Sequence, residues 1–348
     1  MVAGVFIVNP AFQLNSPTGR TTLVKAVVFD GTLACREVPA PQAGGWVVLA
    51  VKKAGICGTD LAIVSGHLRA RTPLVLGHEV FGTVSSAPEG RRDLLEKRAV
   101  TEINVACGRC AYCRMGLNTH CDRVQTLGIS RDGGFAEYVA TPPENIHLVP
   151  DTIGDEEAPF VEPLAASVQL TKVSPPVPGS TWAVVGTGRM GLLVLQVLKL
   201  HSPRILVAIG HEGKKLAMAR RLGATTFTTG EAPKALELTR GTKFDNVVEA
   251  TGAPEGLALA MELVRPRGTV HLKSTHGLPV QFDATKVAVD ELRIQGSRCG
   301  PFDEAIALLE RHEVRVAEMV THRFPLERCD DAFEAAASKS AVKVIFEI

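Results

Sequence analysis

Residues 181–200 read TWAVVGTGRMGLLVLQVLKL, and this segment carries the strongest indication of the chain's architecture. The apolar run at 181–185 predicts a buried strand, and an apolar helix follows a turn that contains Gly186, Gly188 and Gly191. Glycine permits a tight turn at the first position, approach of a pyrophosphate at the second and helix-on-strand packing at the third. Three glycines are common in turns, so the flanking strand and helix give the pattern its weight.

Strand and helix patterns alternate after this turn. Apolar, β-branched segments predict strands at 204–210, 225–229, 244–252, 268–275 and 292–298, and helices are expected at 212–222, 232–239 and 254–264. Such alternation predicts a doubly wound parallel sheet that is covered by helices on both faces. The fold class is therefore α/β.

The chain before about residue 150 has a different pattern, with short β-type runs broken by glycine and proline. Short strands at close spacing predict a small, partly open β-barrel. Two helices and the last strand, VKVIFEI, are expected to pack back against this barrel. The predicted organisation is an arm at 1–23, a first barrel piece at 24–165, a nucleotide-binding domain at 166–296 and a second barrel piece at 297–348.

Composition excludes several classes of partner. With 348 residues the chain is long enough for two cores, and 38 basic residues nearly cancel 37 acidic ones. This balance predicts no nucleic-acid or membrane partner, and no apolar run approaches the roughly 18–20 residues that span a bilayer. The first residues lack the basic region of a signal peptide, so a cytoplasmic location is expected.

Four of the eight cysteines are clustered: Cys107, Cys110, Cys113 and Cys121. Their spacing suits a closed tetrahedral Cys₄ shell, which predicts a structural zinc ion. Two disulfides or a coincidence of free thiols are the alternatives, but cysteines separated by two residues are awkward partners for a disulfide.

Residues 54–79 place a second set of donor groups close together: Cys57, Thr59, His78 and Glu79. Sulfur, imidazole nitrogen and carboxylate oxygen suit zinc with one open position, as catalysis requires. Taken by itself, a single cysteine in an apolar stretch is as often a small buried hydrophobe.

Six motifs together resemble those of the zinc-dependent medium-chain dehydrogenases and reductases, which include alcohol, polyol, threonine and sugar dehydrogenases. They are G-I-C-G-T-D, L-G-H-E, the four-cysteine lobe, E-P-L-A, G-T-G-R-M-G and the terminal K-V-I-F, and the match runs from about Val24 to Ile348. The resemblance implies a GroES-like catalytic domain in two pieces, a Rossmann domain between them and an active site in the cleft. It also implies two zinc ions per chain, a small alcohol or carbonyl substrate, and a homodimer or homotetramer.

The resemblance implies a role for each matching residue. Cys57 and His78 match the first two catalytic zinc ligands, and Glu162 matches the polyol and sugar branch, where this glutamate binds zinc directly or through water. Glu79 matches a ligand or a partner of a ligand, and Thr59 matches the hydroxyl that relays the alcohol proton. In such enzymes zinc lowers the pKa of the bound alcohol before hydride leaves to the nicotinamide.

One departure concerns the proton exit. Many relatives have a histidine five residues after the first ligand, whereas this chain has Ala62. Water or Asp60 must then receive the proton, and His67 is interpreted as a loop histidine.

A second departure concerns the cofactor, which the glycine turn with Arg189 and Met190 is expected to bind. The strand end that usually offers an acid to the ribose is Gly210, and His211 with Lys214 or Lys215 could receive a 2′-phosphate instead. NADP is therefore favoured over NAD, although Glu212 could approach the ribose.

Two competing interpretations remain within reach of this fold. One is a zinc-free quinone or enone reductase, and the other is a non-catalytic nucleotide-binding sensor or scaffold. Each is expected to lack zinc ligands that are present here.

Overall fold

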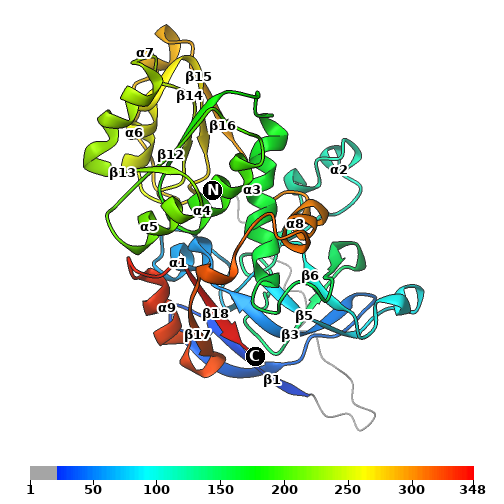
Figure 1. Cartoon of the computed structure of the whole chain (residues 1–348). Helices are drawn as coiled ribbons and strands as arrows, with labels where there is room; N and C mark the ends of the chain where they lie inside the picture. Colours follow the sequence, from blue (N-terminus) through cyan, green and yellow to red (C-terminus); the bar gives the residue numbers. More distant parts are fainter. Residues whose placement is uncertain (1–21) are drawn as a thin grey trace, which may run out of the picture.

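The computed structural model describes residues 22–348, which form two bodies, a barrel body and a parallel-sheet body (Figure 1). Leu23 begins the first strand, so the rest of the expected arm lies outside the described residues. Within the described part, no helix is long and apolar enough to cross a membrane.

The barrel body is built on a seven-stranded sheet. In spatial order its strands are β10 (Ile146–Leu148), β6 (Arg98–Thr101), β5 (Glu79–Ser86), β3 (Val47–Gly55), β18 (Lys343–Glu347) and β17 (Val320–Pro325), with β9 (Tyr138–Thr141) also on β3. Two smaller sheets contain β2 (Leu33–Pro39), β1 (Leu23–Phe29) and β4 (Leu74–Val75), and β7 (Asn104–Val105) with β8 (Gln125–Thr126).

Short helices complete the barrel body: α1 (Gly58–Val64), α2 (Ala111–Arg114), α8 (Phe302–Glu310) and α9 (Cys329–Ala337). Its 3₁₀ turns are η1 (Glu89–Leu94), η2 (Asn118–His120), η3 (Pro143–Asn145), η4 (Ala158–Phe160), η6 (Ala317–Met319) and η7 (Leu326–Arg328).

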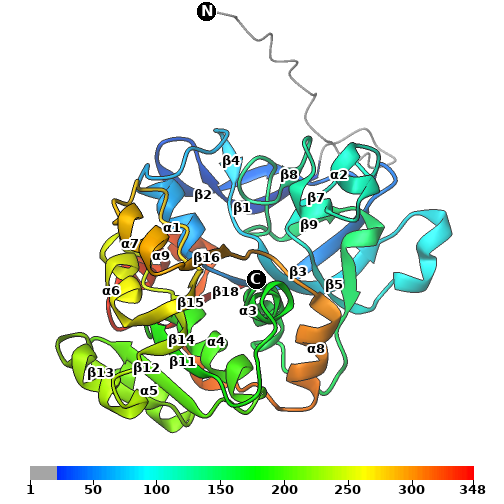
Figure 2. The ribbon, with the colours of Figure 1, turned by 90° about the horizontal axis from the view of Figure 1, so that it is seen from above.

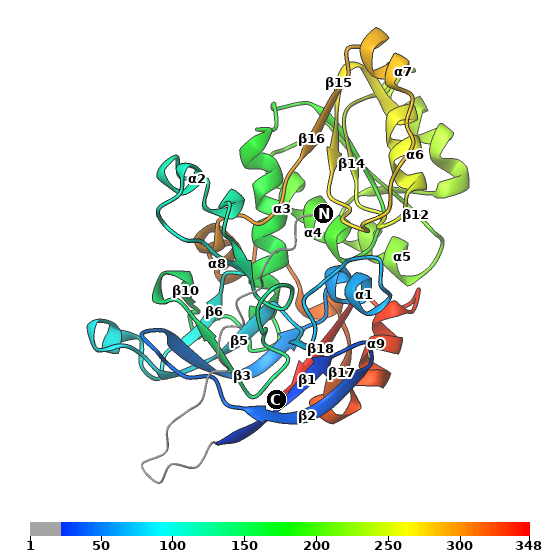
Figure 3. The same ribbon diagram turned by 180° about the vertical axis from the view of Figure 1, so that it is seen from behind.

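The last strand of the chain lies beside β3, as Figure 3 shows from behind. Ile345 pairs with Gly55 and Phe346 with Ala54 in antiparallel register. The β-branched and aromatic residues of β18 favour a strand and are buried in the barrel core. Because β3 ends two residues before Cys57, this pairing brings the end of the chain to the segment that carries the first predicted ligand.

The parallel-sheet body holds six parallel strands. Their order is β13 (Thr225–Thr228), β12 (Ile205–Gly210), β11 (Thr181–Val185), β14 (Phe244–Glu249), β15 (Val264–Leu272) and β16 (Arg293–Gly296). The helices are α4 (Arg189–Lys199), α5 (Lys214–Arg221), α6 (Glu255–Leu263) and α7 (Ala284–Val289). The α/β doubly wound fold class is confirmed.

The two faces of this sheet have different cores. Val184 packs in one hydrophobic cluster with Leu192 of α4, whereas its neighbour Val185 packs in another cluster with Leu257 of α6. Successive strand residues point to opposite faces, so α4 and α6 cover opposite sides. The order of strands reverses at β11, and in open parallel sheets a ligand crevice forms at the carboxyl ends beside such a point.

One predicted helix has a different form. Residues expected to form a helix at 232–239 belong to the 3₁₀ segment η5 (Thr229–Thr239), which contains Pro233. Proline removes a backbone donor and clashes with the preceding turn, so a regular α-helix is disfavoured there.

Helix α3 (Val161–Val173) runs from one body to the other (Figure 1), and α8 lies beside it in the view from above (Figure 2). Most of its residues are buried, because α4, α8 and the barrel pack around it, and its exposed residues are the last two, Lys172 and Val173. The helix passes without a break through residues 165 and 166, so the domain boundary placed there stays a prediction.

Candidate functional site

The first predicted ligands come from two adjacent strands. Cys57 follows β3 at the N-cap of α1, and Glu79 begins β5 opposite Gly55 in the antiparallel pair. A Cβ at Gly55 would overlap the Lys343 ammonium group and the Glu79 carboxylate. Glycine at this position therefore lets the Lys343 ammonium group and the Glu79 carboxylate approach each other.

Ligand atoms of Cys57, His78 and Glu79 all lie within 4.8 Å of one another. His78 and Glu79 are almost fully buried, at 2% and 0% exposure. Glu79 Oε1, the carboxylate oxygen that does not contact Lys343, makes no hydrogen bond to any residue from 22 to 348. A buried carboxylate oxygen without a hydrogen bond is costly, and a bound cation would satisfy it. The sulfur, nitrogen and oxygen set thus fits zinc.

Asp60, which the sequence left open as a proton acceptor, orients both predicted ligands. One of its oxygens accepts a 2.8 Å hydrogen bond from the Cys57 backbone N–H, and the other lies 3.6 Å from His78 Nδ1. His78 therefore turns Nε2 away from Asp60, which is the usual arrangement around a metal-bound histidine. Asp60 is fully buried, so it offers no direct exit to solvent.

The site favours a charged form for its thiol and imidazole. Burial opposes ionisation of Cys57, but the nearby His78 and Arg189 charges and the Thr59 N–H lower its pKa well below the usual value. Burial also opposes the imidazolium, yet Asp60 and Cys57 raise the pKa of His78 to about 9. A thiolate is the form that binds metals. Thr59 lies on α1 beside this sulfur.

Glu162 lies near these groups but outside the tight set of three. It stands in the first turn of α3, and burial raises its pKa to about 7, against the lowering effect of His78. Lys273, which sequence reasoning did not single out, also lowers it. The structure therefore brings Glu162 to the site without placing its carboxylate within 4.8 Å of all three other ligand atoms.

Glu79 is shared with two cations that were not predicted as its partners. Its Oε2 contacts the buried Lys343 ammonium group, and its Oε1 lies 3.9 Å from Arg189 Nε. The sequence signal for Lys343 was a lysine within an otherwise apolar last strand. Buried lysines require a partner, which here is Glu79. The two residues meet because β18 and β5 both pair with β3.

The four clustered cysteines form the second candidate metal centre. Ligand atoms of Cys107, Cys110, Cys113 and Cys121 lie within 4.8 Å of one another, and all four thiols are free. Backbone N–H groups donate to the sulfurs of Cys110 and Cys121. A hydrogen bond from the Arg109 backbone contributes most to lowering the pKa of Cys107, which falls to about 6. Sulfurs that converge and accept hydrogen bonds fit a closed Cys₄ zinc shell.

The glycine turn lies at the carboxyl end of β11. Gly186 has φ +106°, and a Cβ there would overlap the Ala250 carbonyl group. A Cβ at Gly191 would overlap the carbonyl of Gly186, whereas Gly188 has nothing within 4 Å of that position. Gly188 is the N-cap of α4, so free space adjoins the N–H groups of a helix N-terminus. Met190 follows in the first turn and packs toward α3, where Ser167 donates to its sulfur.

The end of β12 carries no acid. Gly210 ends the strand, and a Cβ there would overlap the side-chain oxygen of Thr187, a residue that sequence reasoning missed. His211 is exposed and Lys215 is half-buried. Burial, and then the Arg189 charge, lower the pKa of Lys215, so a second positive charge acts on this end of the sheet.

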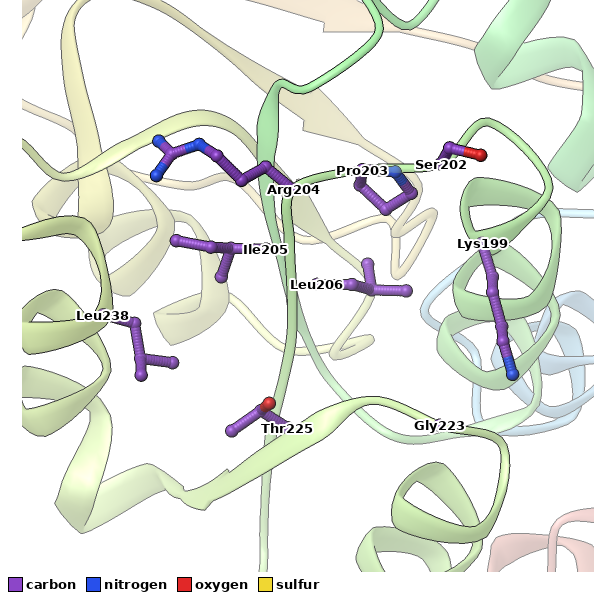
Figure 4. Close-up of a pocket in the computed structure, with 9 residues that line it drawn as sticks. All are labelled: Lys199, Ser202, Pro203, Arg204, Ile205, Leu206, Gly223, Thr225 and Leu238. Atoms are coloured by element: carbon purple, nitrogen blue, oxygen red, sulfur yellow. The ribbon is translucent and has the colours of Figure 1, made fainter.

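The described part of the structure contains two hollows, one lined by α1 and α9 and the other at the start of β12. A hollow of about 560 Å³ reaches Gly58, the residue after Cys57, and its walls come from α1, α9 and the loop after β15, including Ala62, His67 and His276. The other, of about 400 Å³, lies between Lys199, Arg204 and Leu238 where β12 begins (Figure 4). The glycine turn stands at the carboxyl end of the sheet, so this second hollow is remote from it.

Known proteins match this chain in both of its bodies. The family described as alcohol dehydrogenase GroES-like domain matches residues 43–151, and the zinc-binding dehydrogenase family matches residues 190–313. A sorbitol dehydrogenase from Halalkalibacterium halodurans is 31% identical, over 93% of this chain and 98% of its own length.

Two solved structures are also similar. A zinc-binding dehydrogenase from Sinorhizobium meliloti bound to NADP has a TM-score of 0.87 at 29% identity, covering 94% of this chain and 100% of that chain. An alcohol dehydrogenase from Escherichia coli complexed with NADH has a TM-score of 0.86 at 27% identity, covering 94% and 99%. The chain belongs to the zinc-type medium-chain dehydrogenase/reductase family, and it is an oxidoreductase.

Proposed function

We propose that this protein is a zinc-dependent dehydrogenase that moves hydride between NAD(P) and an alcohol, polyol or sugar, or the matching aldehyde or ketone. The observation that carries the proposal is the convergence of Cys57, His78 and Glu79 within 4.8 Å. This group lies close to Arg189, the first residue of α4, the helix that follows the glycine turn and is called the cofactor helix below. The sorbitol dehydrogenase relative supports the polyol class.

Two zinc ions per chain are proposed. Cys57 and His78 would hold the first, with Glu162 or Glu79 as the oxygen ligand, and the four-cysteine lobe would hold the second. Bound at the first site, zinc supplies a Lewis acid that favours the alkoxide over the alcohol. Lys343 already contacts one Glu79 oxygen, which favours Glu162 as the oxygen ligand.

The chain's own residues would prepare the site and remove a proton. Asp60 fixes the Cys57 backbone and faces the ring of His78, while the Thr59 hydroxyl would accept the substrate proton. Asp60 is fully buried, so water in the hollow that Ala62 lines is the proposed next acceptor. The small alanine side chain leaves room for it.

NADP is proposed as the preferred cofactor. Gly210 places no carboxylate at the end of β12, and Thr187 fills the space where such a side chain would begin. The exposed His211 and the half-buried Lys215 offer positive or hydrogen-bonding groups to a 2′-phosphate. The similar solved structures bind NADP in one case and NADH in the other, so direct titration is required.

We also propose that the protein is a homodimer or homotetramer and that it is located in the cytoplasm. β16 is an edge strand of the parallel sheet, and Ile294 on it is 36% exposed. An exposed edge can pair with a second copy of the chain. Light scattering after size-exclusion chromatography measures the mass directly.

The deciding experiment is a panel of alcohols, polyols and aldoses with NAD⁺ and NADP⁺, followed by absorbance of the reduced nicotinamide. Cys57→Ser should abolish turnover and remove about one zinc per chain. Glu162→Ala should lower turnover without unfolding the protein. Full activity of Cys57→Ser on every substrate that the wild type oxidises would refute the proposed metal site.

A further inference from the structure

The side chain of Arg189 reaches out of the body to which its backbone belongs. Arg189 is the first residue of α4, at the N-terminus where a pyrophosphate is expected. Its Nη1 nonetheless donates a 2.9 Å hydrogen bond to the Ile56 carbonyl, in the residue before Cys57. The cofactor helix is thereby bonded to the backbone beside a predicted metal ligand.

A second cation, Lys343 of the barrel body, contacts the same Ile56 carbonyl and the Glu79 carboxylate. Lys343 of β18 donates to the Ile56 carbonyl at 3.4 Å and contacts Oε2 of Glu79. Arg189 Nε lies 3.9 Å from Oε1 of the same carboxylate. One carbonyl and one carboxylate are thus shared by a lysine from the barrel body and an arginine from the parallel-sheet body.

The arginine is not saturated by these contacts. Its Nε is buried and makes no hydrogen bond to any residue in the described part of the chain. The side chain is 17% exposed, and its positive charge adds to burial in lowering the pKa of the half-buried Lys215. A guanidinium group with a free buried N–H at a helix N-terminus favours an anion there.

We infer that Arg189 is a positioning residue that couples the cofactor turn to the candidate catalytic metal centre. An anionic cofactor at the helix N-terminus draws on the same guanidinium group that holds the Ile56 carbonyl and faces Glu79. Binding of the dinucleotide therefore changes the position of Cys57. It also changes how strongly Lys343, relative to Arg189, interacts with the Glu79 carboxylate. This inference rests on the proposed function, because it requires a metal at Cys57 and a dinucleotide at the glycine turn.

Three variants separate coupling from simple attachment of the two bodies. Arg189→Met keeps length and removes the charge, and Arg189→Lys keeps the charge but loses the planar fork. Arg221→Met is the matched control, since Arg221 of α5 makes a 3.2 Å ion pair with Glu318 of η6, between the same two bodies. Circular dichroism establishes whether each variant is folded. If Arg189→Met does not fold, Arg189→Lys replaces it as the test variant.

The readout is the visible absorption of protein loaded with Co²⁺, with and without saturating NADP⁺. Subtraction of the Cys57→Ser spectrum isolates the bands of the candidate catalytic centre from those of the four-cysteine lobe. NADP⁺ is expected to shift these bands in the wild type and in Arg221→Met. In Arg189→Met the shift should be absent at saturation, and Arg189→Lys should recover part of it.

Nucleotide affinity gives an independent measure. NADPH fluorescence titration should show about 10-fold weaker binding to Arg189→Met, as loss of one charge-assisted hydrogen bond implies, and unchanged binding to Arg221→Met. A full NADP⁺-induced shift in Arg189→Met would overturn the coupling while leaving the proposed function intact. Absence of any Cys57-dependent band in the wild type would overturn both.

Discussion

The ammonium nitrogen of Lys273 donates a 2.8 Å hydrogen bond to the carbonyl of Ala166, one helical turn beyond Glu162. The same nitrogen also donates to the carbonyl and the hydroxyl of Ser297. Lys273 thus ties helix α3 to the segments that follow β15 and β16. Burial lowers its pKa to about 8, so the charge is retained at neutral pH.

Lys273→Met should destabilise the protein by about 1–3 kcal/mol, because the Ser297 carbonyl loses its cationic donor. Urea unfolding followed by tryptophan fluorescence measures the change. The control is Lys199→Met, since Lys199 is exposed and donates one bond, to the Leu222 carbonyl. Its effect should stay below about 0.5 kcal/mol. Equal losses in both variants would contradict a special role for Lys273.

His147 should make stability depend on pH. Burial opposes its charge, but hydrogen bonds to Glu102 (2.9 Å) and Asp303 (2.8 Å) raise the pKa of His147 above its ordinary 6.5. A folded-state pKa above the unfolded value stabilises fully below about pH 6.5, and the contribution is lost as pH rises through the folded pKa. The Tm difference between wild type and His147→Gln should therefore shrink from pH 6 to pH 9.

The control for this series is His322→Gln, because His322 bonds to the hydroxyl of Thr321 and to no carboxylate among residues 22–348. Its Tm difference from wild type should stay constant over the same range. A constant difference for His147→Gln as well would mean that the two carboxylates do not hold a proton on the ring.

Cys113→Ser should remove about one zinc per chain and lower Tm, because three remaining thiols cannot close the tetrahedral shell. Metal analysis by mass spectrometry measures the zinc content. Cys35→Ser is the matched control, since Cys35 is a free thiol outside the cluster and should leave the content unchanged. Loss of zinc from Cys35→Ser to the same extent would refute the assignment.

Cofactor preference should change only when two positions change together. Gly210→Asp introduces the carboxylate that NAD enzymes use, but its Cβ overlaps Thr187, so this variant should lose affinity for both nucleotides. Adding Thr187→Gly should restore binding with a preference for NAD. Fluorescence titration with NADH and NADPH measures both affinities.

Gly230→Asp is the control for the added charge, because a Cβ at Gly230 meets nothing within 4 Å. It should leave both affinities unchanged. If Gly210→Asp by itself already prefers NAD, the contact with Thr187 does not restrict the strand end.

Much of the architecture followed from local patterns. The strand, glycine turn and helix at 181–200 predicted the parallel sheet because burial on both faces requires continuous apolar strands. The cysteine spacing predicted that the four thiols of the lobe lie together, since nearby positions on a tight loop cannot separate far. The helix expected near 232–239 was wrong in type because Pro233 was given too little weight.

The donor types and motifs of the sequence predicted Cys57, His78, Glu79 and Glu162 as one ligand set. The structure brings the first three within 4.8 Å of one another, because Cys57 follows β3 and Glu79 begins β5, and these strands pair. The sequence could not supply the groups that surround Glu79. Lys343 arrives through the register of β18 on β3, and Arg189 arrives through the contact between the two bodies. Such partners depend on which surfaces meet after folding. The spacing of residues along the chain does not determine how close Lys343 and Arg189 come to Glu79.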